Sequence, residues 1–440
     1  MKLLAPEKRI LFRHIDTPNL TSIDVYEKTG GYQSLRKALG MAPDALIEEV
    51  KKSGLRGRGG AGFPTGMKWG FVPFQSGKPI YLLCNADESE PGCFKDRVIL
   101  EKNPHQLIEG IIIAAHAVRS RKSYIYIRGE YAFAARVLEK AIAEAVTRGY
   151  LGRKILGSEH SLELVIHRGA GAYICGEETG LISSLEGKKG YPKLKPPFPA
   201  VSGFLNCPTV VNNVETLANI PWIVANGGAA YAGYGTEKSR GTRLFCVSGW
   251  VKRPGTYEEE MGVPLKTLID HYAGGMRDGA RLKAVIPGGS STPPLTADEA
   301  DRVLMDYDDI ARYGTFLGAG GIIVIPDHFP LGKILERITE FYWDESCGQC
   351  TPCREGTGWL FKIARALEHG QGKARDLGDL TRTARTMMGS TICALSDAAA
   401  MPVLGFLQKF PEDFERLANG AEGRHQRDRP THLARMESDA

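Results

Sequence analysis

The sequence contains no apolar run long enough to cross a bilayer. Its most apolar stretch, Leu107–Val118, is short and carries Glu109 and His116, whereas a membrane-spanning helix needs about 20 mostly apolar residues. The N-terminal segment, Met-Lys-Leu-Leu-Ala-Pro-Glu-Lys-Arg, lacks the apolar core of a signal peptide. We therefore expect a cytoplasmic protein that inserts nothing into a membrane itself, although it can be bound to a membrane complex.

A strong charge of either sign is also absent. The 440 residues carry a formal net charge of +5, which is too small for this length to indicate nucleic-acid binding. Nine unevenly spaced cysteines do not form the pattern of a secreted disulfide framework. We interpret five scattered ones as buried free thiols in a reducing compartment: Cys84, Cys93, Cys175, Cys207 and Cys246. The length predicts about three domains of ordinary globular composition.

Three cysteines, in contrast, are closely spaced: Cys347, Cys350 and Cys353 in Glu-Ser-Cys-Gly-Gln-Cys-Thr-Pro-Cys-Arg-Glu-Gly. Two successive gaps of two residues let one turn direct three thiolates at one point, which favours a [4Fe–4S] cluster over a single structural zinc. Thr357 stands where a two-cluster ferredoxin has its fourth cysteine. The fourth ligand must come from elsewhere, and Cys393 is the only cysteine further along the chain.

The first part of the chain predicts an α/β domain. Residues 1–72 form an N-terminal arm, a helix at Asp44–Ser53 and a glycine-rich loop. Strand and helix signals then alternate, which predicts a Rossmann-like, mostly parallel sheet over 73–240. The predicted strands are Pro79–Cys84, Ser123–Ile127 and Leu162–His167, and the predicted helices are Asn103–Arg119, Glu130–Arg148 and Glu177–Leu185. The proline-rich stretch Pro192–Pro208 should be extended and irregular.

The pattern changes after residue 240. Strands at Arg243–Ser248, Gly255–Glu259, Leu282–Ile286 and Gly321–Ile325, with a helix at Pro264–Tyr272, predict a β-grasp, ubiquitin-like module over 241–328. Residues 329–419 have helical periodicity and contain both cysteine segments, so a helical bundle should hold the cluster. Residues 420–440 are charged and poor in apolar residues, which predicts a flexible tail.

A glycine-dense loop, Gly54-Leu-Arg-Gly-Arg-Gly-Gly-Ala-Gly-Phe-Pro-Thr-Gly66, is the first candidate nucleotide site. Its glycines let backbone N–H groups approach a phosphate, and Arg56, Arg58 and Lys68 add positive charge. The loop matches neither the P-loop nor the Rossmann fingerprint, so it belongs to another kind of nucleotide site. A flexible surface linker is the weaker alternative, because arginines, aromatics and a proline are interleaved with the glycines.

Two further segments follow predicted strands, where a parallel sheet places its ligands. The first is Cys84-Asn-Ala-Asp-Glu-Ser-Glu-Pro-Gly-Cys-Phe-Lys-Asp-Arg97. Its acidic side chains could accept hydrogen bonds from ribityl or ribose hydroxyls, or bind a cation. The alternative is a loop that is merely solvated. The second, His167-Arg-Gly-Ala-Gly-Ala-Tyr-Ile-Cys-Gly-Glu-Glu-Thr-Gly180, places Glu177 and Glu178 at a helix start. Helix capping explains one glutamate but not obviously both. Asn212 and Asn213 could read a heteroaromatic edge, or one of them could be an N-cap.

With these segments in this order, the chain resembles the NADH-binding flavoprotein subunit of respiratory complex I, over about residues 30–415. The resemblance rests on Gly-Arg-Gly-Gly-Ala-Gly-Phe-Pro-Thr-Gly, Asn-Ala-Asp-Glu-Ser-Glu-Pro-Gly, Gly-Ala-Gly-Ala-Tyr-Ile-Cys-Gly-Glu-Glu-Thr and Glu-Ser-Cys-Gly-x-Cys-x-Pro-Cys-Arg-Glu-Gly. It implies an NADH:quinone oxidoreductase that uses FMN and a [4Fe–4S] cluster and takes part in proton translocation within the full complex. Cys93 departs from the family's usual Ser or Thr, and we expect it to be a silent thiol.

The resemblance also implies site residues and partners. FMN should be surrounded by Gly57, Arg58, Gly59, Gly60, Gly62, Lys68, Asn85, Asp87, Glu88, Tyr173, Gly176, Glu177, Asn212, Asn213 and Thr216. The NADH adenine should stack on Phe63, Phe71 and Phe198, its ribose should meet Glu178 and Lys195, and Glu90 should lie near the nicotinamide, which makes Glu90 and Glu178 the catalytic candidates. Cys347, Cys350, Cys353 and Cys393 should hold the cluster. The implied partners are a small thioredoxin-like [2Fe–2S] subunit and a large multi-cluster subunit, on the inner face of the cell membrane.

Two alternatives remain open. The same module resembles the diaphorase subunit of soluble NAD-linked hydrogenases and formate dehydrogenases, many of which carry additional ferredoxin domains that this sequence lacks. A non-enzymatic nucleotide-binding protein with a zinc-stapled helical end is the alternative from another class.

Overall fold

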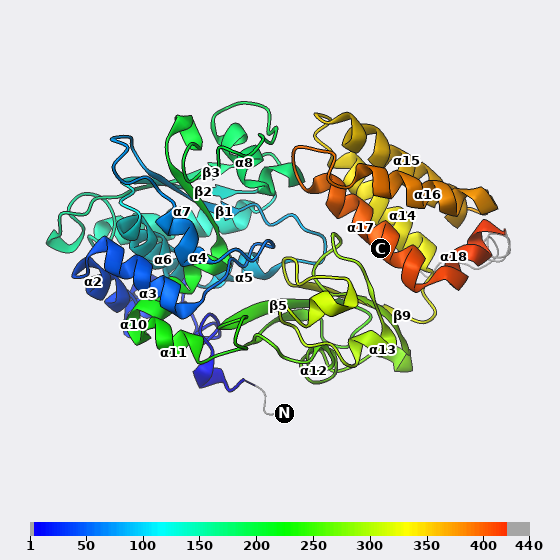
Figure 1. The fold of residues 1–440 in the computed structure, drawn as a ribbon. Helices are drawn as coiled ribbons and strands as arrows, with labels where there is room; N and C mark the ends of the chain where they lie inside the picture. Colours follow the sequence, from blue (N-terminus) through cyan, green and yellow to red (C-terminus); the bar gives the residue numbers. More distant parts are fainter. Residues whose placement is uncertain (1–3, 420–440) are drawn as a thin grey trace, which may run out of the picture. The chain divides into compact units, whose positions relative to one another are not determined.

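The computed structural model describes residues 4–419, and it divides the chain into two compact units, one ending at Asp327 and one starting at His328. The elements of each unit can be followed in Figure 1. The tail predicted for residues 420–440 lies outside the described residues. Within the described residues, no helix is long and apolar enough to cross a membrane.

The N-terminal arm is more regular than the sequence predicts. It contains a 3-10 turn at Pro6–Lys8 and the helices α1 (Ile23–Lys28) and α2 (Gln33–Leu39), before α3 (Pro43–Ser53) and α4 (Thr65–Gly70). Much of its order comes from residues distant in sequence. The buried Glu258 carboxylate, for example, accepts hydrogen bonds from the backbone N–H groups of Ile10 (2.8 Å), Leu11 (3.0 Å) and Phe12 (2.7 Å). Periodicity within the arm cannot report such long-range anchors.

The first sheet is parallel, as predicted. Its strands are β1 (Tyr81–Ala86), β2 (Lys122–Ile127), β3 (Glu163–Arg168) and β4 (Thr209–Asn213), in the order β3-β2-β1-β4. Helices α6 and α7 pack against it. The helices of this region are α5 (Lys95–Lys102), α6 (Pro104–Ala117), α7 (Ala132–Thr147), α8 (Glu178–Leu185), α9 (Val214–Ala218), α10 (Ile220–Asn226) and α11 (Gly228–Ala232). Three strands match the prediction; β4 was missed because its short apolar run sits between a proline and two asparagines.

The second sheet has the order β6-β5-β9-β7-β8. Strands β5 and β6 form the predicted antiparallel hairpin, and β9 runs parallel to β5. The strands are β5 (Thr242–Gly249), β6 (Gly255–Glu260), β7 (Leu282–Ile286), β8 (Leu295–Thr296) and β9 (Gly321–Pro326). The predicted helix Pro264–Tyr272 forms as α12 (Leu265–Thr267) followed by a π-helical turn at Leu268–Tyr272, and α13 spans Ala297–Ala300. This arrangement confirms a β-grasp-like module with its own apolar core.

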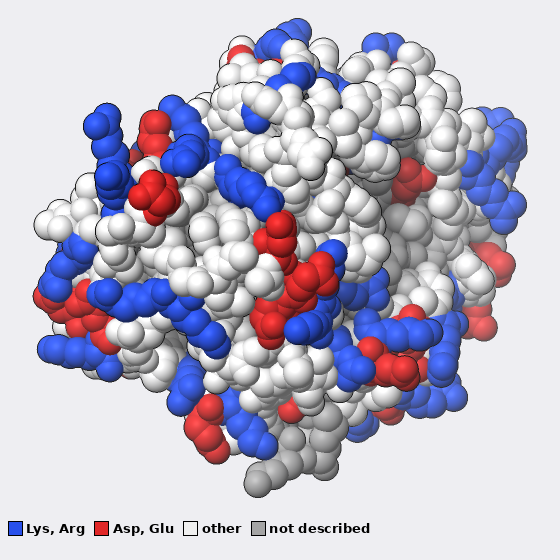
Figure 2. Space-filling model, turned by 60° about the vertical axis from the view of Figure 1, so that its left-hand side comes forward, with Lys and Arg blue, Asp and Glu red and all other residues white. Residues whose placement is uncertain are grey.

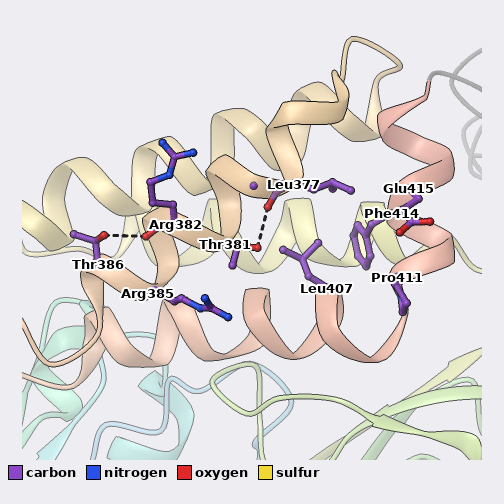
Figure 3. Close-up of a pocket in the computed structure, with 10 residues that line it drawn as sticks. Leu377, Thr381, Arg382, Arg385, Thr386, Leu407, Pro411, Phe414 and Glu415 are labelled. Carbon is purple, nitrogen blue, oxygen red and sulfur yellow. Dashed lines mark hydrogen bonds between the residues drawn. The ribbon is translucent and has the colours of Figure 1, made fainter.

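The second unit is helical, which confirms the sequence prediction. Its helices are α14 (Leu331–Asp344), α15 (Thr351–Glu368), α16 (Ala374–Met387), α17 (Leu395–Lys409) and α18 (Pro411–Ala418). A hollow of about 590 Å³ lies among α16, α17 and α18, where Leu377, Leu407 and Phe414 provide apolar walls (Figure 3). The hydroxyls of Thr381 and Thr386 in this hollow donate to carbonyls of α16 itself. None of the predicted site residues lines it.

Charged side chains are interspersed on the face drawn in Figure 2, and no continuous stripe of one sign crosses that face. This distribution agrees with the small net charge of +5. It offers no electrostatic track of the kind that follows a nucleic-acid backbone.

Candidate functional site

Four segments distant in sequence meet in pairs at the carboxyl edge of the first sheet. A Cβ added to Gly59 would come within 3.0 Å of Asn213 Cβ, so the glycine-rich loop lies directly on the end of β4. A Cβ at Gly176 would lie 3.5 Å from the carbonyl oxygen of Asp87, so the loop after β3 contacts the loop after β1. The convergence expected from strand polarity is therefore present.

The glycine-rich loop is a closed projection rather than a flexible linker. Gly57 N–H donates to the carbonyl of Phe63 (2.8 Å), and Thr65 N–H donates to that of Leu55 (2.9 Å), which closes its neck. At the tip, Gly60 has φ +134° with open space where a Cβ would be, a conformation that disfavours other residues. The tip amides can thus be approached closely by a ligand.

Arg58 is fully buried at the base of this loop. Its backbone N–H donates to Thr216 Oγ1 (2.9 Å), and its Nη2 donates to the carbonyls of Arg240 (2.8 Å) and Thr242 (3.0 Å). Its Nε and Nη1 have no hydrogen-bond partner in the structure. Buried, unpartnered guanidinium N–H groups are costly unless an acceptor is supplied, and an anionic group would satisfy this chemistry.

Two lysines and two glutamates form a neutral cluster beside the loop. Lys68 Nζ lies 2.8 Å from Glu178 Oε2, and Lys195 Nζ lies 2.7 Å from Glu178 Oε1 and 3.1 Å from Glu177 Oε1. Burial alone raises the pKa of Glu178, but Lys68 and Lys195 outweigh that effect and hold the pKa below its usual value. Glu177 also caps α8 by accepting from the N–H groups of Thr179 and Gly180. Glu177 is therefore explained as the N-cap of α8, and Glu178 is held by its ion pairs with Lys68 and Lys195.

The acidic loop after β1 is not a solvated loop. Glu90 accepts hydrogen bonds from the Tyr173 hydroxyl (2.7 Å), the Ser291 N–H (2.8 Å) and the Ser290 hydroxyl (3.3 Å). Burial raises the pKa of Glu90, and these hydrogen bonds oppose the rise. Ser290 and Ser291 were missed by the sequence analysis, because nothing near them in the sequence links them to a loop 200 residues away.

Glu88 has a structural task in the same loop. Its carboxylate accepts from the N–H groups of Asp96 (3.0 Å) and Arg97 (3.0 Å) at the start of α5, from the Tyr131 hydroxyl (3.0 Å) and from Cys93 Sγ (3.3 Å). These four donors occupy its side chain. In the part of the chain that the structure describes, no three His, Cys, Asp or Glu side chains are grouped so as to hold a single metal ion.

Hydrogen bonds to neighbouring residues fix the side chains of Asn212 and Asn213. Asn212 Oδ1 accepts from Trp69 Nε1 (2.8 Å), while Asn213 is the N-cap of α9 and accepts from Glu215 N–H (3.0 Å). Asn213 also donates to Asp96 Oδ2 (2.5 Å) and accepts from Lys95 Nζ (3.2 Å). The N-cap alternative is confirmed for Asn213, and one of its amide hydrogens remains for a ligand.

A buried charge cluster supports Asn213 and was not predicted. Lys95 Nζ lies 2.7 Å from Asp96 Oδ1 and 3.0 Å from Glu215 Oε2. Burial raises the pKa of Asp96 to about 7, although Lys95 opposes the rise. Reversing the Asn213 amide would place its NH2 group against the Lys95 ammonium, so this cluster fixes the amide orientation.

The remaining predicted residues lie at the rim. Asn85 Nδ2 donates to the Gly176 carbonyl (2.8 Å), and Asn85 Oδ1 accepts from Asp87 N–H (3.1 Å). Three aromatic rings are open to solvent: Phe63 (45% exposed), Phe71 (55%) and Phe198 (58%). Phe63 and Phe71 have ring centroids 5.9 Å apart. Exposed aromatic rings beside a polar site suit a planar ligand ring.

The closely spaced cysteines lie at the start of α15, in the helical unit. Cys350 is its N-cap, Cys353 lies in its first turn, and Ser346 Oγ lies 3.3 Å from Cys353 Sγ. Burial raises the pKa of Cys353, and the neighbouring Cys347 and Cys350 thiols raise it further, whereas Ser346 lowers it. Cys393 lies just before α17, and none of the four forms a disulfide. The thiols of Cys347, Cys350 and Cys353 at one helix start have the all-sulfur chemistry that suits an iron–sulfur cluster.

Comparison with known families matches three stretches of this chain. Residues 50–222 match the Nuo51 FMN-binding domain, 243–324 match the SLBB domain, and 333–417 match the NADH-ubiquinone oxidoreductase-F iron-sulfur binding region. Every residue discussed above falls within these stretches or between them, apart from the N-terminal arm.

Similar proteins cover nearly the whole chain. The NADH-quinone oxidoreductase F subunit 2 of Rhizobium meliloti (strain 1021) is 52% identical over 406 residues, which is 92% of this chain and 96% of that protein. The NADH-quinone oxidoreductase F subunit of Streptomyces coelicolor (strain ATCC BAA-471 / A3(2) / M145) is 51% identical over 95% of this chain and 92% of that protein. Among solved structures, an NAD+-reducing [NiFe]-hydrogenase in the H2-reduced state has a TM-score of 0.82 and 35% identity, over 94% of this chain and 68% of that chain.

Proposed function

Since this chain belongs to the family of NADH-quinone oxidoreductase F subunits, we propose that it is the NADH dehydrogenase module of such an enzyme. It oxidises NADH with FMN and passes the electrons through a [4Fe–4S] cluster to partner subunits and on toward quinone. The observation that carries the proposal is the meeting of the glycine-rich loop with the ends of β1, β3 and β4, within the stretch that matches an FMN-binding domain.

The polar groups at this edge fit FMN. The tip amides of the glycine-rich loop and the unpartnered Nε and Nη1 of Arg58 suit its phosphate. The residues that would surround it are Gly57, Arg58, Gly59, Gly60, Gly62, Lys68, Asn85, Asp87, Glu88, Tyr173, Gly176, Glu177, Asn212, Asn213 and Thr216. Among them Glu88 contributes through α5 and the loop, because four donors already occupy its carboxylate.

NADH would enter over the exposed aromatic rim. Phe63, Phe71 and Phe198 offer flat surfaces for the adenine, and Glu178 with Lys195 would meet the adjacent ribose. A carboxylate there disfavours a 2′-phosphate, which predicts NADH over NADPH. Glu90, held by three donors, would fix the position of the nicotinamide.

The chemistry needs alignment more than acid–base catalysis. When bound, FMN accepts an electron pair as hydride and returns the electrons singly, and the cluster carries them one at a time. The chain supplies fixed positions on the flavin side: Glu90 and Asn213 are held by neighbouring donors and acceptors. Cys347, Cys350, Cys353 and Cys393 would bind the cluster as thiolates. Hydride transfer to a flavin requires no protein base.

The proposed partners are a small thioredoxin-like [2Fe–2S] subunit and a large multi-cluster subunit, which would hold the chain at the inner face of the cell membrane. Support for docking comes from the helical unit, where Trp343 (40%) and Trp359 (56%) are exposed. Large exposed aromatic side chains are frequent anchors of protein interfaces. We also propose that 73–240 and 241–328 are separate domains, because each contains its own sheet.

A second candidate is the diaphorase subunit of a soluble NAD-linked hydrogenase or formate dehydrogenase. It is favoured by one observation, the TM-score of 0.82 to an NAD+-reducing [NiFe]-hydrogenase. The two candidates share the NADH chemistry and differ in the assembly. Purification of the native complex separates them: NADH-dependent quinone reduction supports the first, and hydrogen- or formate-dependent NAD+ reduction supports the second.

The function itself is tested on the purified full-length chain by flavin and iron analysis together with NADH oxidation by ferricyanide. We expect about one FMN and four iron atoms per chain, and steady NADH oxidation. A preparation that contains zinc, no flavin and no NADH activity would refute the proposal and favour the non-enzymatic alternative.

A further inference from the structure

Tyr307, in the connection after α13, brings the module of the second sheet against the glycine-rich loop. Its hydroxyl donates to the carbonyl oxygen of Gly57 (3.3 Å), and its backbone N–H donates to Ser239 Oγ (3.1 Å). A Cβ at Gly62, whose φ is +64°, would lie 2.5 Å from Tyr307 Cε1. The ring of Tyr307 is therefore packed directly against the loop.

This contact completes a clamp on one peptide unit. The carbonyl of Gly57 and the N–H of Arg58 belong to the same peptide group. Tyr307 holds the carbonyl end from the connection after α13, and Thr216 Oγ1 holds the N–H end (2.9 Å) from α9. Because a peptide group is planar, fixing both ends fixes its orientation, and with it the starting direction of the segment that leads to Gly59 and Gly60.

Arg56 closes the same clamp from the other side. Its guanidinium carbon lies 3.7 Å from the centre of the Tyr307 ring, and its Nε donates to the carbonyl of Gly62 (2.6 Å). Burial alone raises the pKa of Tyr307, but the positive charges of Arg243, Arg58 and Arg56 outweigh it and lower the pKa. A more acidic hydroxyl is a stronger hydrogen-bond donor to the Gly57 carbonyl.

We propose that Tyr307 is a positioning residue of the flavin site: it holds the glycine-rich loop in the shape that binds the phosphate of FMN. This inference rests on the proposed FMN function and extends the nucleotide site into the SLBB-like module. That module also holds Glu90 through Ser290 and Ser291. Loops of this module thus support both the phosphate side and the nicotinamide side of the site.

The test compares FMN with riboflavin, which has the same ring system and no phosphate. The full-length chain is freed of flavin, and each ligand is titrated by flavin fluorescence in the wild type and in Tyr307→Phe. The matched control is Tyr257→Phe, because the Tyr257 hydroxyl, in the same module, also donates to a backbone carbonyl, that of Arg253 (2.6 Å). Melting temperatures of the flavin-free proteins report the structural part of each change.

We expect Tyr307→Phe to weaken FMN binding about three- to tenfold, the size of one hydrogen bond, and riboflavin binding less than about twofold. Tyr257→Phe should change neither. Arg56→Lys keeps the charge but loses the hydrogen bond to Gly62 and the flat stacking on Tyr307, so it should also weaken the binding of FMN more than that of riboflavin. It replaces Tyr307→Phe as the test variant if Tyr307→Phe does not fold. Equal weakening of both ligands, or no weakening of FMN, would overturn the proposal. Wild-type protein that binds no FMN would instead refute the proposed function.

Discussion

Glu178→Gln should raise the use of NADPH relative to NADH. Glu178 belongs to a cluster of two lysines and two glutamates, with contacts of 2.7 Å to Lys195 and 2.8 Å to Lys68. The cluster is neutral as it stands, and removal of one carboxylate leaves it with a charge of about +1. The positively charged cluster would then attract the doubly charged 2′-phosphate of NADPH, which the Glu178 carboxylate repels in the wild type.

The size of the effect follows from the burial of the cluster. A charge pair at about 4 Å is worth roughly 1 kcal/mol in water and roughly 4 kcal/mol near a protein surface. Glu178 is about one-fifth exposed, so we take about 1–2 kcal/mol after screening by solvent and salt. This corresponds to a gain of about five- to thirtyfold in the ratio of kcat/KM for NADPH to that for NADH.

The assay is ferricyanide reduction with each nucleotide at several ionic strengths. Glu186→Gln is the matched control, because Glu186 lies at the other end of α8 and also pairs with two lysines, Lys188 (2.8 Å) and Lys193 (3.4 Å). The control should leave the ratio unchanged, and the gain in Glu178→Gln should shrink as salt rises. A ratio that stays at the wild-type value in Glu178→Gln would refute this account of nucleotide selectivity.

Three other perturbations have defined outcomes. Cys393→Ala should remove the iron–sulfur absorption yet leave flavin reduction by NADH intact. Loss of both signals would contradict the proposal that Cys393 serves the cluster alone. Glu258→Gln should lower the free energy of unfolding by about 3 kcal/mol, because one of the two oxygens that accept from backbone donors of the N-terminal arm becomes an NH2 group, which cannot accept. Glu163→Gln at the exposed pair with Lys122 should change this free energy by less than about 1 kcal/mol, and equal effects of the two variants in urea unfolding would refute the anchoring role. Asp96 has its folded pKa raised from 3.8 to about 7, so its contribution to stability is present below about pH 4 and is lost as the pH rises through 7. Asp96→Asn should therefore flatten the decline of the free energy of unfolding between pH 4 and pH 8. An unchanged decline would show that other groups cause it.

The sequence was sufficient to predict features that follow from local patterns or from the polarity of parallel strands. The acidic loop after β1 and the loop after β3 were predicted to lie at one edge, because carboxyl ends of parallel strands share one edge. The glycine-rich loop and the paired asparagines were assigned to the same site only through the resemblance to a known family. The helices of the cysteine unit were predicted from periodicity alone. These features depend on residues close together in sequence or on a general rule of topology.

Long-range contacts were beyond sequence reasoning. Ser290 and Ser291 reach Glu90 from the loop between β7 and β8, and Glu258 orders an arm nearly 250 residues away. The burial of Lys95 and Asp96 could not be inferred, because charged residues are usually exposed and only their mutual pairing makes burial tolerable. A single sequence carries no signal for such pairings.

The most direct test of the account is an anaerobic titration of the full-length chain with NADH, followed by visible absorption. We expect flavin and iron–sulfur bands that both bleach, in the wild type, with the iron–sulfur part missing in Cys393→Ala. A wild-type spectrum without a flavin band, or a flavin band that NADH does not bleach, would contradict the claim that this chain takes electrons from NADH.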